Sequence, residues 1–214
     1  MRRFCNVDQH IILLLHFDGD IVDSASNTAI VNSGITFSEG VFGQCAHKTG
    51  NAFLTLPEGY LADLVAKEEF TIDLWYKSNV FTDASDLFIG NCRSGDTGSM
   101  RFMVYMAGSY FRIYVGNLGN ENYFTLLWAD IDPALKGQWM HIAWCVKGSM
   151  QYIFINGHLV ASGQIANKNV PAYTTMMFNV TDLNANHEFL MDEFRISDIC
   201  RWTSDFEVPK TPYA

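Results

Sequence analysis

The chain has 214 residues, of which 49% are hydrophobic, 14% aromatic and 17% charged, a composition that excludes a disordered chain. Its net charge is −9 at pH 7, with 14 Lys and Arg scattered among 23 acids, so it lacks the clustered basic side chains that bind nucleic-acid phosphates. At this length folding buries about 70% of the surface of the unfolded chain, which is enough for a core without disulfides or metals.

The first apolar run is Ile11–Leu15, preceded by Arg2 and Arg3. A signal peptide would continue into a small-residue cleavage site, whereas the polar, turn-like segment 16–20 follows here. The run is also far shorter than the ~20 residues that cross a bilayer. We therefore expect a buried first strand in a protein made without an export signal and without membrane insertion.

The middle of the chain alternates apolar and polar residues with a period of two, which predicts strands. In segment 70–77 one face carries Phe70, Ile72, Leu74 and Tyr76. Segment 101–115 alternates similarly, with a hairpin turn at 107–109, and 139–146 is another strand. The segment 60–67 is the one helical candidate, and we expect one or two turns there.

The second half of the chain has the strongest local signal, Asn156-Gly157 between the apolar segments 151–155 and 158–161. Asn-Gly tolerates the two positive φ values of a type I′ turn, so this segment predicts a β-hairpin. Two late strands follow at 176–180 and 188–196. Glycine-punctuated short strands without a linker or repeat predict an all-β, two-sheet antiparallel sandwich. We expect one domain over 1–214, with its core at about 10–200 and a C-terminal tail at 201–214.

The five cysteines are widely spaced and include no CxxC pair, which excludes a zinc knuckle and a CxxC redox motif. We interpret them as mostly reduced thiols of a protein folded in a reducing cytosol. The sequence alone does not exclude a single disulfide.

Four stretches in order resemble the concanavalin A-like superfamily, and its laminin-G-like jelly rolls in particular. The segment 14–19 with Asp23-Ser24 resembles their first strand, and 70–75 resembles their "FTIEFW" strand. Segment 137–143, continued by 154–157, is similar to "G-x-W-x-H-[VI]-A … Y-[VI]-N-G", and 191–196 resembles "IDEVRI". The resemblance covers nearly the whole chain and implies a jelly-roll β-sandwich. The tail resembles the "ARYTSNFTPPTAPY" ending of such domains in tailed-phage virion proteins.

Asp192 is the acid that needs an explanation. Alternation places it on one face of its strand with three apolar residues, and places Arg195 on the opposite face. An unpaired ionised carboxylate among apolar neighbours would be costly, so a partner is expected. The three apolar residues of that face are Leu190, Phe194 and Ile196.

The resemblance implies a structural calcium ion as that partner. In this superfamily an Asp at this point of the last strand commonly binds calcium together with carbonyl oxygens from early segments. Carried over to this sequence, the ligands are Asp192, Asp18 or the carbonyl of Phe17, and Gly50. Oxygen ligands from separate segments suit calcium. A hydrogen-bonded or salt-bridged Asp192 without metal is the alternative.

We predict no catalytic residues. Glucanases with this fold carry Glu-x-Asp-x-(x)-Glu on a central strand, which sets two carboxyl groups at the ~5–5.5 Å that retaining hydrolysis needs, and this sequence has no such run. Serine-hydrolase, zinc-protease and nucleotide-binding motifs are also missing. His141 is interpreted as a packed side chain.

A sugar platform is the candidate binding site. Aromatic residues and amides gather between 105 and 128, where flat rings can stack on a pyranose and amides can hydrogen-bond its hydroxyls. Most of these rings are expected to belong to the core, with Tyr123 and Trp128 as the main exceptions. The candidate ligand-binding residues are Tyr110, Asn117, Asn120, Asn122, Tyr123 and Trp128.

The function expected is a non-enzymatic virion component, in a capsid, tail or fibre, that occurs in repeated copies. It would contact neighbouring subunits or a host-surface glycan, through a terminal segment or the loop 116–128. The alternatives are a glycoside hydrolase and a carbohydrate-binding lectin or adhesin, the latter with an extracellular location.

Overall fold

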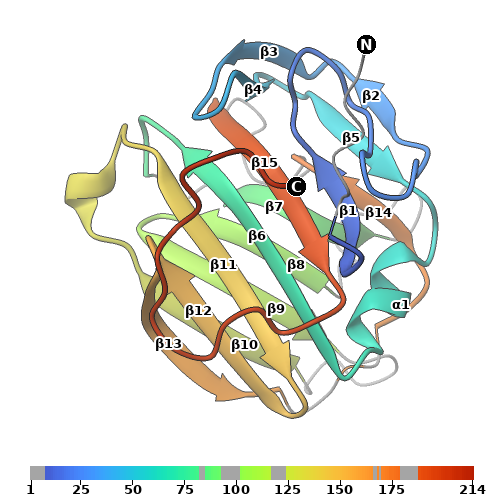
Figure 1. Cartoon of the computed structure of the whole chain (residues 1–214), viewed down its shortest axis with the longest axis vertical. Coiled ribbons are helices and arrows are strands. Elements are labelled where there is room, and N and C mark those ends of the chain that lie inside the picture. Colours follow the sequence, from blue (N-terminus) through green and yellow to red (C-terminus); the bar gives the residue numbers. More distant parts are fainter. Residues whose placement is uncertain are drawn as a thin grey trace.

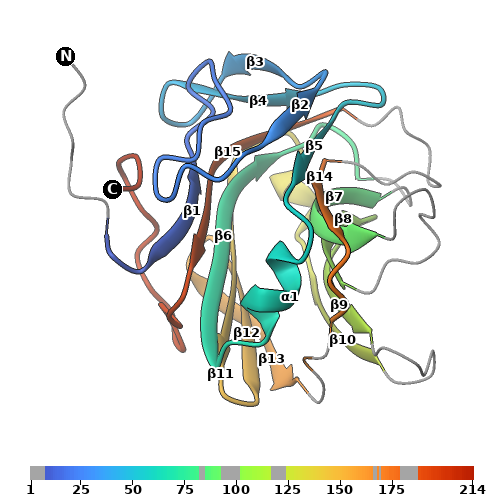
Figure 2. The ribbon, with the colours of Figure 1, turned by 90° about the vertical axis from the view of Figure 1, so that its right-hand side faces the viewer.

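The computed structural model describes residues 8–81, 85–92, 102–116, 124–165, 168, 170–178 and 188–214. They form two antiparallel sheets packed face to face, with the helix α1 (Tyr60–Val65) beside them (Figure 2). The predicted all-β jelly-roll sandwich is confirmed. No helix in the described part of the chain is long and apolar enough to cross a membrane.

The first sheet has the strand order β13-β12-β11-β6-β15-β4-β3, and β1 also pairs with β15 (Figure 1). Its strands are β1 (Ile11–Leu15), β3 (Thr36–Glu39), β4 (Gln44–Lys48), β6 (Glu69–Lys77), β11 (Met140–Lys147), β12 (Met150–Ile155), β13 (His158–Gln164) and β15 (Phe189–Ser197). The second sheet has the order β10-β9-β8-β7-β14-β5-β2. Its strands are β2 (Val31–Ser33), β5 (Phe53–Leu56), β7 (Ser85–Cys92), β8 (Phe102–Ala107), β9 (Tyr110–Gly116), β10 (Phe124–Asp130) and β14 (Thr174–Met177).

The core lies between the inner faces of the two sheets, as period-two alternation requires. The predicted inward face of β6 is confirmed, because Phe70, Ile72, Leu74 and Tyr76 are all buried in the main apolar cluster. From β11 and β9, Trp144, Phe111 and Ile113 join the same cluster. Alternate residues of these strands therefore face outward, and they decide what each outer surface can do.

Two predicted hairpins are confirmed. Strands β8 and β9 pair through Ala107 and Tyr110, so only two residues form the turn between them. Strands β12 and β13 turn at Asn156 and Gly157, whose φ values of 50° and 80° are those of a type I′ turn.

Strand β15 differs from the sequence prediction at its middle. Glu193 has φ 49° and the register with β6 shifts between Asp192 and Arg195, which identifies a β-bulge. Residues before the bulge pair with β4 and residues after it pair with β1 on the same edge. Met191 and Phe194 are therefore both core residues, and the predicted placement of Asp192 on the face of Phe194 and Ile196 was wrong.

The C-terminal segment 201–214 runs back across the outer face of the first sheet, as Figures 1 and 2 show. The ring of Trp202 stacks on that of Phe206, with centroids 3.8 Å apart and planes 6° apart. Tyr213 is 6% exposed. The tail aromatics therefore pack within the chain itself, with Trp202 and Phe206 still partly exposed.

Candidate functional site

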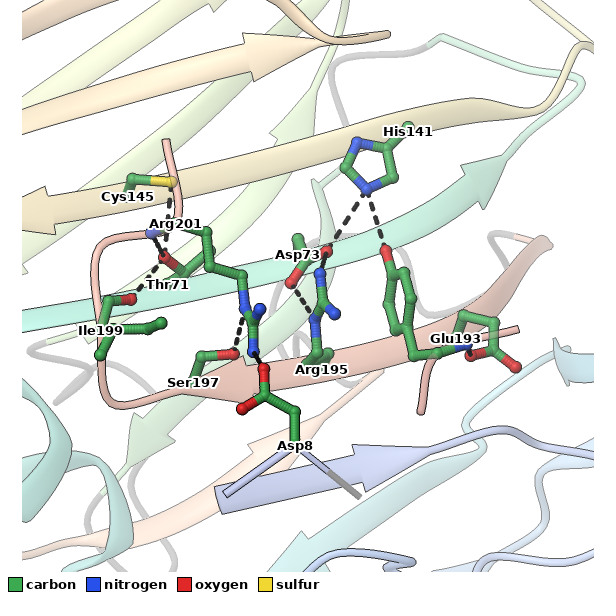
Figure 3. A network of polar contacts seen from close by, with 11 residues as sticks. Asp8, Thr71, Asp73, His141, Cys145, Glu193, Arg195, Ser197, Ile199 and Arg201 are labelled. Atoms are coloured by element: carbon green, nitrogen blue, oxygen red, sulfur yellow. Dashed lines mark hydrogen bonds and ion pairs between the residues drawn. The ribbon is translucent and has the colours of Figure 1, made fainter. Parts of the chain in front are cut away.

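The outer face of the first sheet holds a buried polar network beneath the tail (Figure 3). Arg195 donates through Nε and Nη2 to the two carboxylate oxygens of Asp73, at 2.9 and 2.8 Å. The Arg195 guanidinium also lies 3.8 Å from the centroid of the Tyr213 ring, a cation–π contact. Burial alone would raise the pKa of the Asp73 carboxyl, but the charge of Arg195 and hydrogen bonds from Arg195 and His141 hold it well below its usual value.

The remaining members of this network tie the tail down. His141 is fully buried, with Nε2 2.9 Å from the Tyr213 hydroxyl and 3.4 Å from Asp73, so the prediction of a packed histidine is confirmed. The Glu193 carboxylate accepts from the Tyr213 N–H at 2.8 Å and contacts His16 at 2.8 Å. The hydrogen bond to Glu193 raises the pKa of His16. Apart from His141 Nδ1, which has no hydrogen-bond partner among the described residues, the polar groups named here bond to one another, so we assign this face a structural role.

Two predicted calcium ligands, Asp18 and Asp192, meet at the loop 40–43 that joins β3 to β4. Asp192 Oδ2 accepts from the N–H groups of Val41 and Phe42 at 2.7 and 3.1 Å, and Asp18 Oδ1 accepts from Gln44 at 2.8 Å. A side chain at Gly40 or Gly43 would overlap these carboxylates, which explains both glycines.

The predicted ligand Gly50 lies two residues beyond the end of β4, outside the printed pairing of β4 with β15, which runs from Phe189 to Met191. Its place in a calcium site stays a prediction.

Asp192 has one unsatisfied oxygen. Its side chain is fully buried and Oδ1 has no hydrogen-bond partner among the described residues. Burial, opposed by the hydrogen bonds from Phe42 and Val41, raises the Asp192 pKa to about 6. In the described part of the chain no three His, Cys, Asp or Glu side chains converge as metal ligands, so a cation here would depend on carbonyl oxygens as well.

The outer face of the second sheet presents exposed aromatic side chains. Strand pairing aligns Trp128, Arg112 and Tyr105 in one row across β10, β9 and β8. Trp128 is 53% exposed and is the only exposed tryptophan among the described large apolar side chains. Tyr110 lies on the same face of β9 and is 36% exposed, with the Arg112 guanidinium 5.1 Å from its ring centroid.

Beside Tyr105, the row of paired residues reaches a small apolar cluster on β7. Leu87 of β7 pairs with Tyr105 and is fully buried, and it forms a small cluster with Met103, Tyr105 and Met176 outside the main core. The face thus combines a buried aliphatic base, half-buried and exposed rings, and one guanidinium. We call Tyr105, Tyr110, Arg112 and Trp128 the aromatic face.

The structure brings two of the six predicted ligand-binding residues, Tyr110 and Trp128, to this face. The other four, Asn117, Asn120, Asn122 and Tyr123, lie outside the described residues. Sequence reasoning missed Arg112, although its position two residues after Tyr110 on an alternating strand could have identified it.

Comparisons with known proteins agree with this architecture. A family model described as concanavalin A-like lectin/glucanases superfamily matches residues 48–205. The chain is similar in structure to the binding domain of Paraclostridial Mosquitocidal Protein 1, with a TM-score of 0.71, 14% identity, and coverage of 89% of this chain and 49% of that one. It is also similar to the botulinum neurotoxin serotype D binding domain, with a TM-score of 0.71, 13% identity, and coverage of 92% and 50%.

These solved structures support the fold alone, because the identities are low and this chain spans about half the length of each. A search of curated proteins found no match. The family model covers more than half of the chain, including the strands β6, β11 and β15 that bear the resemblance noted in the sequence. The chain therefore belongs to the concanavalin A-like lectin/glucanases superfamily.

Proposed function

We propose that this protein is a non-enzymatic recognition module that binds a glycan on the aromatic face of its second sheet. The observation that carries the proposal is the exposure of Trp128 beside Arg112 on a rigid strand pair. An indole exposed to water has no reason to be there for stability, whereas it can stack on the apolar face of a sugar ring. The two solved proteins that share this fold are binding domains, and the proposal extends a binding role to this chain.

The other residues of the aromatic face suit the same ligand. Tyr105 and Tyr110 extend the flat surface on either side of Arg112, and Leu87 holds Tyr105 from below. The Arg112 guanidinium has no carboxylate partner among the described residues, and its donors suit hydroxyl or carboxylate oxygens of a sugar.

Hydrolysis is the competing function, and the described acids of the second sheet do not favour it. Its described strands carry two acids, Asp86 and Asp130. The side chain of Asp86 accepts from the hydroxyl of Tyr76, a core residue, whereas Asp130 is exposed at the end of β10. A retaining hydrolase needs two carboxyl groups about 5–5.5 Å apart across one substrate, and a single exposed acid cannot supply them.

The location of this module is proposed on the sequence resemblance of the tail to phage virion proteins, which implies repeated copies on a capsid, tail or fibre. The tail covers the first sheet, which leaves the second sheet as the face for a host-surface glycan or a neighbouring subunit. Mass spectrometry of purified virions tests the location directly.

Replacing Trp128 with alanine is expected to weaken glycan binding by about 5- to 150-fold, because loss of one stacked ring costs roughly 1–3 kcal/mol. Arg112→Ala should weaken it several-fold by removing hydrogen-bond donors. The measurement is a glycan array followed by titration calorimetry on the best ligand. Trp139→Ala is the control, because that ring contacts Lys77 beside the first sheet. Unchanged affinity in both test variants, or no bound glycan at all, would refute the proposal.

A structural calcium ion at Asp192 is the second part of the proposal. The buried Oδ1 of Asp192, which has no partner among the described residues, fits a cation, and carbonyl oxygens of the loop 40–43 and of Phe17 would be its further hard ligands. Such an ion would join the first strand, the loop and the last strand. It would act on stability and take no part in glycan chemistry.

Millimolar calcium chloride is expected to raise the melting temperature of the chelator-treated protein by several degrees, because a ligand bound only to the folded state stabilises it. Asp192→Asn should abolish this increase. Asp20→Asn, which replaces an exposed acid two residues after Asp18, should preserve it. If calcium leaves the melting temperature of the unsubstituted protein unchanged, the calcium proposal is wrong and Asp192 is a buried carboxylate without a metal.

A further inference from the structure

Cys145 and Cys200 lie together between the first sheet and the tail. Cys145 points outward from β11, opposite Thr71 of β6, and belongs to a small outer apolar cluster against which Cys200 also packs. The Thr71 hydroxyl fixes the chain on both sides of Cys200, because it donates to the carbonyl of Ile199 at 2.8 Å and accepts from the N–H of Arg201 at 3.0 Å. The same hydroxyl contacts the sulfur of Cys145 (Figure 3), with the oxygen and sulfur 3.5 Å apart.

The two cysteines pack in the same outer cluster. The buried Cys145 belongs to it and Cys200 packs against it, and the Cys200 thiol reaches the carbonyl of Trp202 at 3.3 Å. The backbone N–H of Cys200 donates to Glu69 at 3.2 Å, so Cys200 is held at its N–H, at its sulfur and by its two neighbours. Two thiols held in this way need little movement to reach the geometry of a disulfide.

The two cysteines differ in a way that suits stepwise oxidation. Cys145 is fully buried, and burial raises the pKa of its thiol. Cys200 is only partly buried, and the hydrogen bond from Cys145 lowers the pKa of the Cys200 thiol. Cys200 is therefore the accessible and more readily ionised member of the pair.

We propose that Cys145 and Cys200 form a disulfide that fastens the tail to the first sheet when the protein meets a low-molecular-weight disulfide such as glutathione disulfide. The Cys200 thiolate attacks one sulfur of that reagent, a mixed disulfide forms at Cys200, and one glutathione thiolate leaves. The Cys145 thiol then loses its proton and attacks the Cys200 sulfur, which releases the second glutathione. Two protein thiols are oxidised and one glutathione disulfide is reduced to two thiols.

The consequence is a covalent connection where the tail now depends on packing and hydrogen bonds. The bond would close a long loop from β11 to the start of the tail, and closing a long loop restricts the unfolded chain. It would stabilise the sheet that faces away from the proposed glycan site. A protein folded with reduced thiols in a cytosol would gain this connection only after release into an oxidising environment.

The test is to incubate the reduced, folded full chain with glutathione disulfide and to measure its intact mass and its peptide map without reductant. We expect the loss of two hydrogen atoms, a peptide linking Cys145 to Cys200, and a rise of about 5–15 °C in melting temperature that dithiothreitol reverses. Cys145→Ser should instead stop at a glutathione adduct on Cys200. Cys45→Ser is the control and should form the link normally, because Cys45 is buried against Ser38 on another strand pair.

If Cys145→Ser fails to fold, brief alkylation of the unmodified protein keeps the test decisive. Cys200 should react before Cys45 and Cys145, the other cysteines whose burial the structure describes, and its alkylation should prevent the loss of two hydrogen atoms. If the protein without substitutions keeps a stable glutathione adduct, or if other cysteines form the link, the proposal is overturned. None of these results bears on glycan binding, so this inference and the proposed function fail independently.

Discussion

Replacement of Arg195 by alanine is expected to lower the free energy of unfolding by about 3–5 kcal/mol, because it leaves the Asp73 carboxylate buried without its counter-charge. Asp73 is fully buried and both its oxygens accept hydrogen bonds from Arg195. The same substitution removes the cation–π contact with Tyr213, so the tail should loosen as well. Urea denaturation followed by tryptophan fluorescence measures the loss.

The control for this prediction is the double variant Asp73→Asn/Arg195→Met. It removes both charges at once, so the desolvated carboxylate that makes the single substitution costly is gone, and at least half of the lost stability should return. Equal destabilisation in the single and double variants would mean that tail packing, and not the buried charge, sets the cost. A loss below about 1 kcal/mol for Arg195→Ala would show that water reaches Asp73 beneath the tail.

Regular alternation and turn chemistry account for the parts of the fold that the sequence predicted. The inward face of β6 followed from period-two alternation, and the turn at Asn156-Gly157 followed from two residues that tolerate positive φ. Both signals lie within one short segment, so they can be read without knowing which strands pair. The bulge in β15 is different, because it exists where two strands, β4 and β1, share one edge of β15. The sequence of segment 188–196 does not indicate that two strands pair with the same edge. For this reason the predicted face of Asp192 was wrong.

The candidate site was predictable only in part for the same reason. Composition marked 105–128 as aromatic, but the separation of core rings such as Phe111 from exposed ones such as Trp128 depends on the register of three strands. Arg112 became part of the site only when pairing placed it between Tyr105 and Trp128. The sequence of the tail shows its apolar rings, but it does not show that Arg195 and His141 on the sheet beneath contact Tyr213 and Phe206.

Gly157→Ala is expected to cost about 2–5 kcal/mol, well beyond the usual effect of a surface glycine. Gly157 has φ 80°, so any side chain is strained there, and a Cβ would overlap the backbone carbonyl oxygen of Phe206 in the tail. The Phe206 N–H donates to the Gly157 carbonyl at 2.9 Å, and Phe206 stacks on Trp202. Pushing the tail away therefore loses a hydrogen bond and a ring stack together.

The matched control is Gly148→Ala in the neighbouring hairpin turn between β11 and β12. Gly148 has φ 59°, so alanine is strained there too, but its Cβ would meet nothing within 4 Å. This variant should lose only about 1–2 kcal/mol from the left-handed conformation. Urea denaturation measures the loss of unfolding free energy in both variants. The rate of chymotrypsin cleavage after Trp202 or Phe206 measures how often the tail leaves the sheet. Faster cleavage in Gly157→Ala alone is the expected result, because only that substitution acts on the contact that holds the tail against the sheet. Equal losses and equal cleavage in the two variants would show that backbone strain is the whole effect and that the tail does not depend on Gly157.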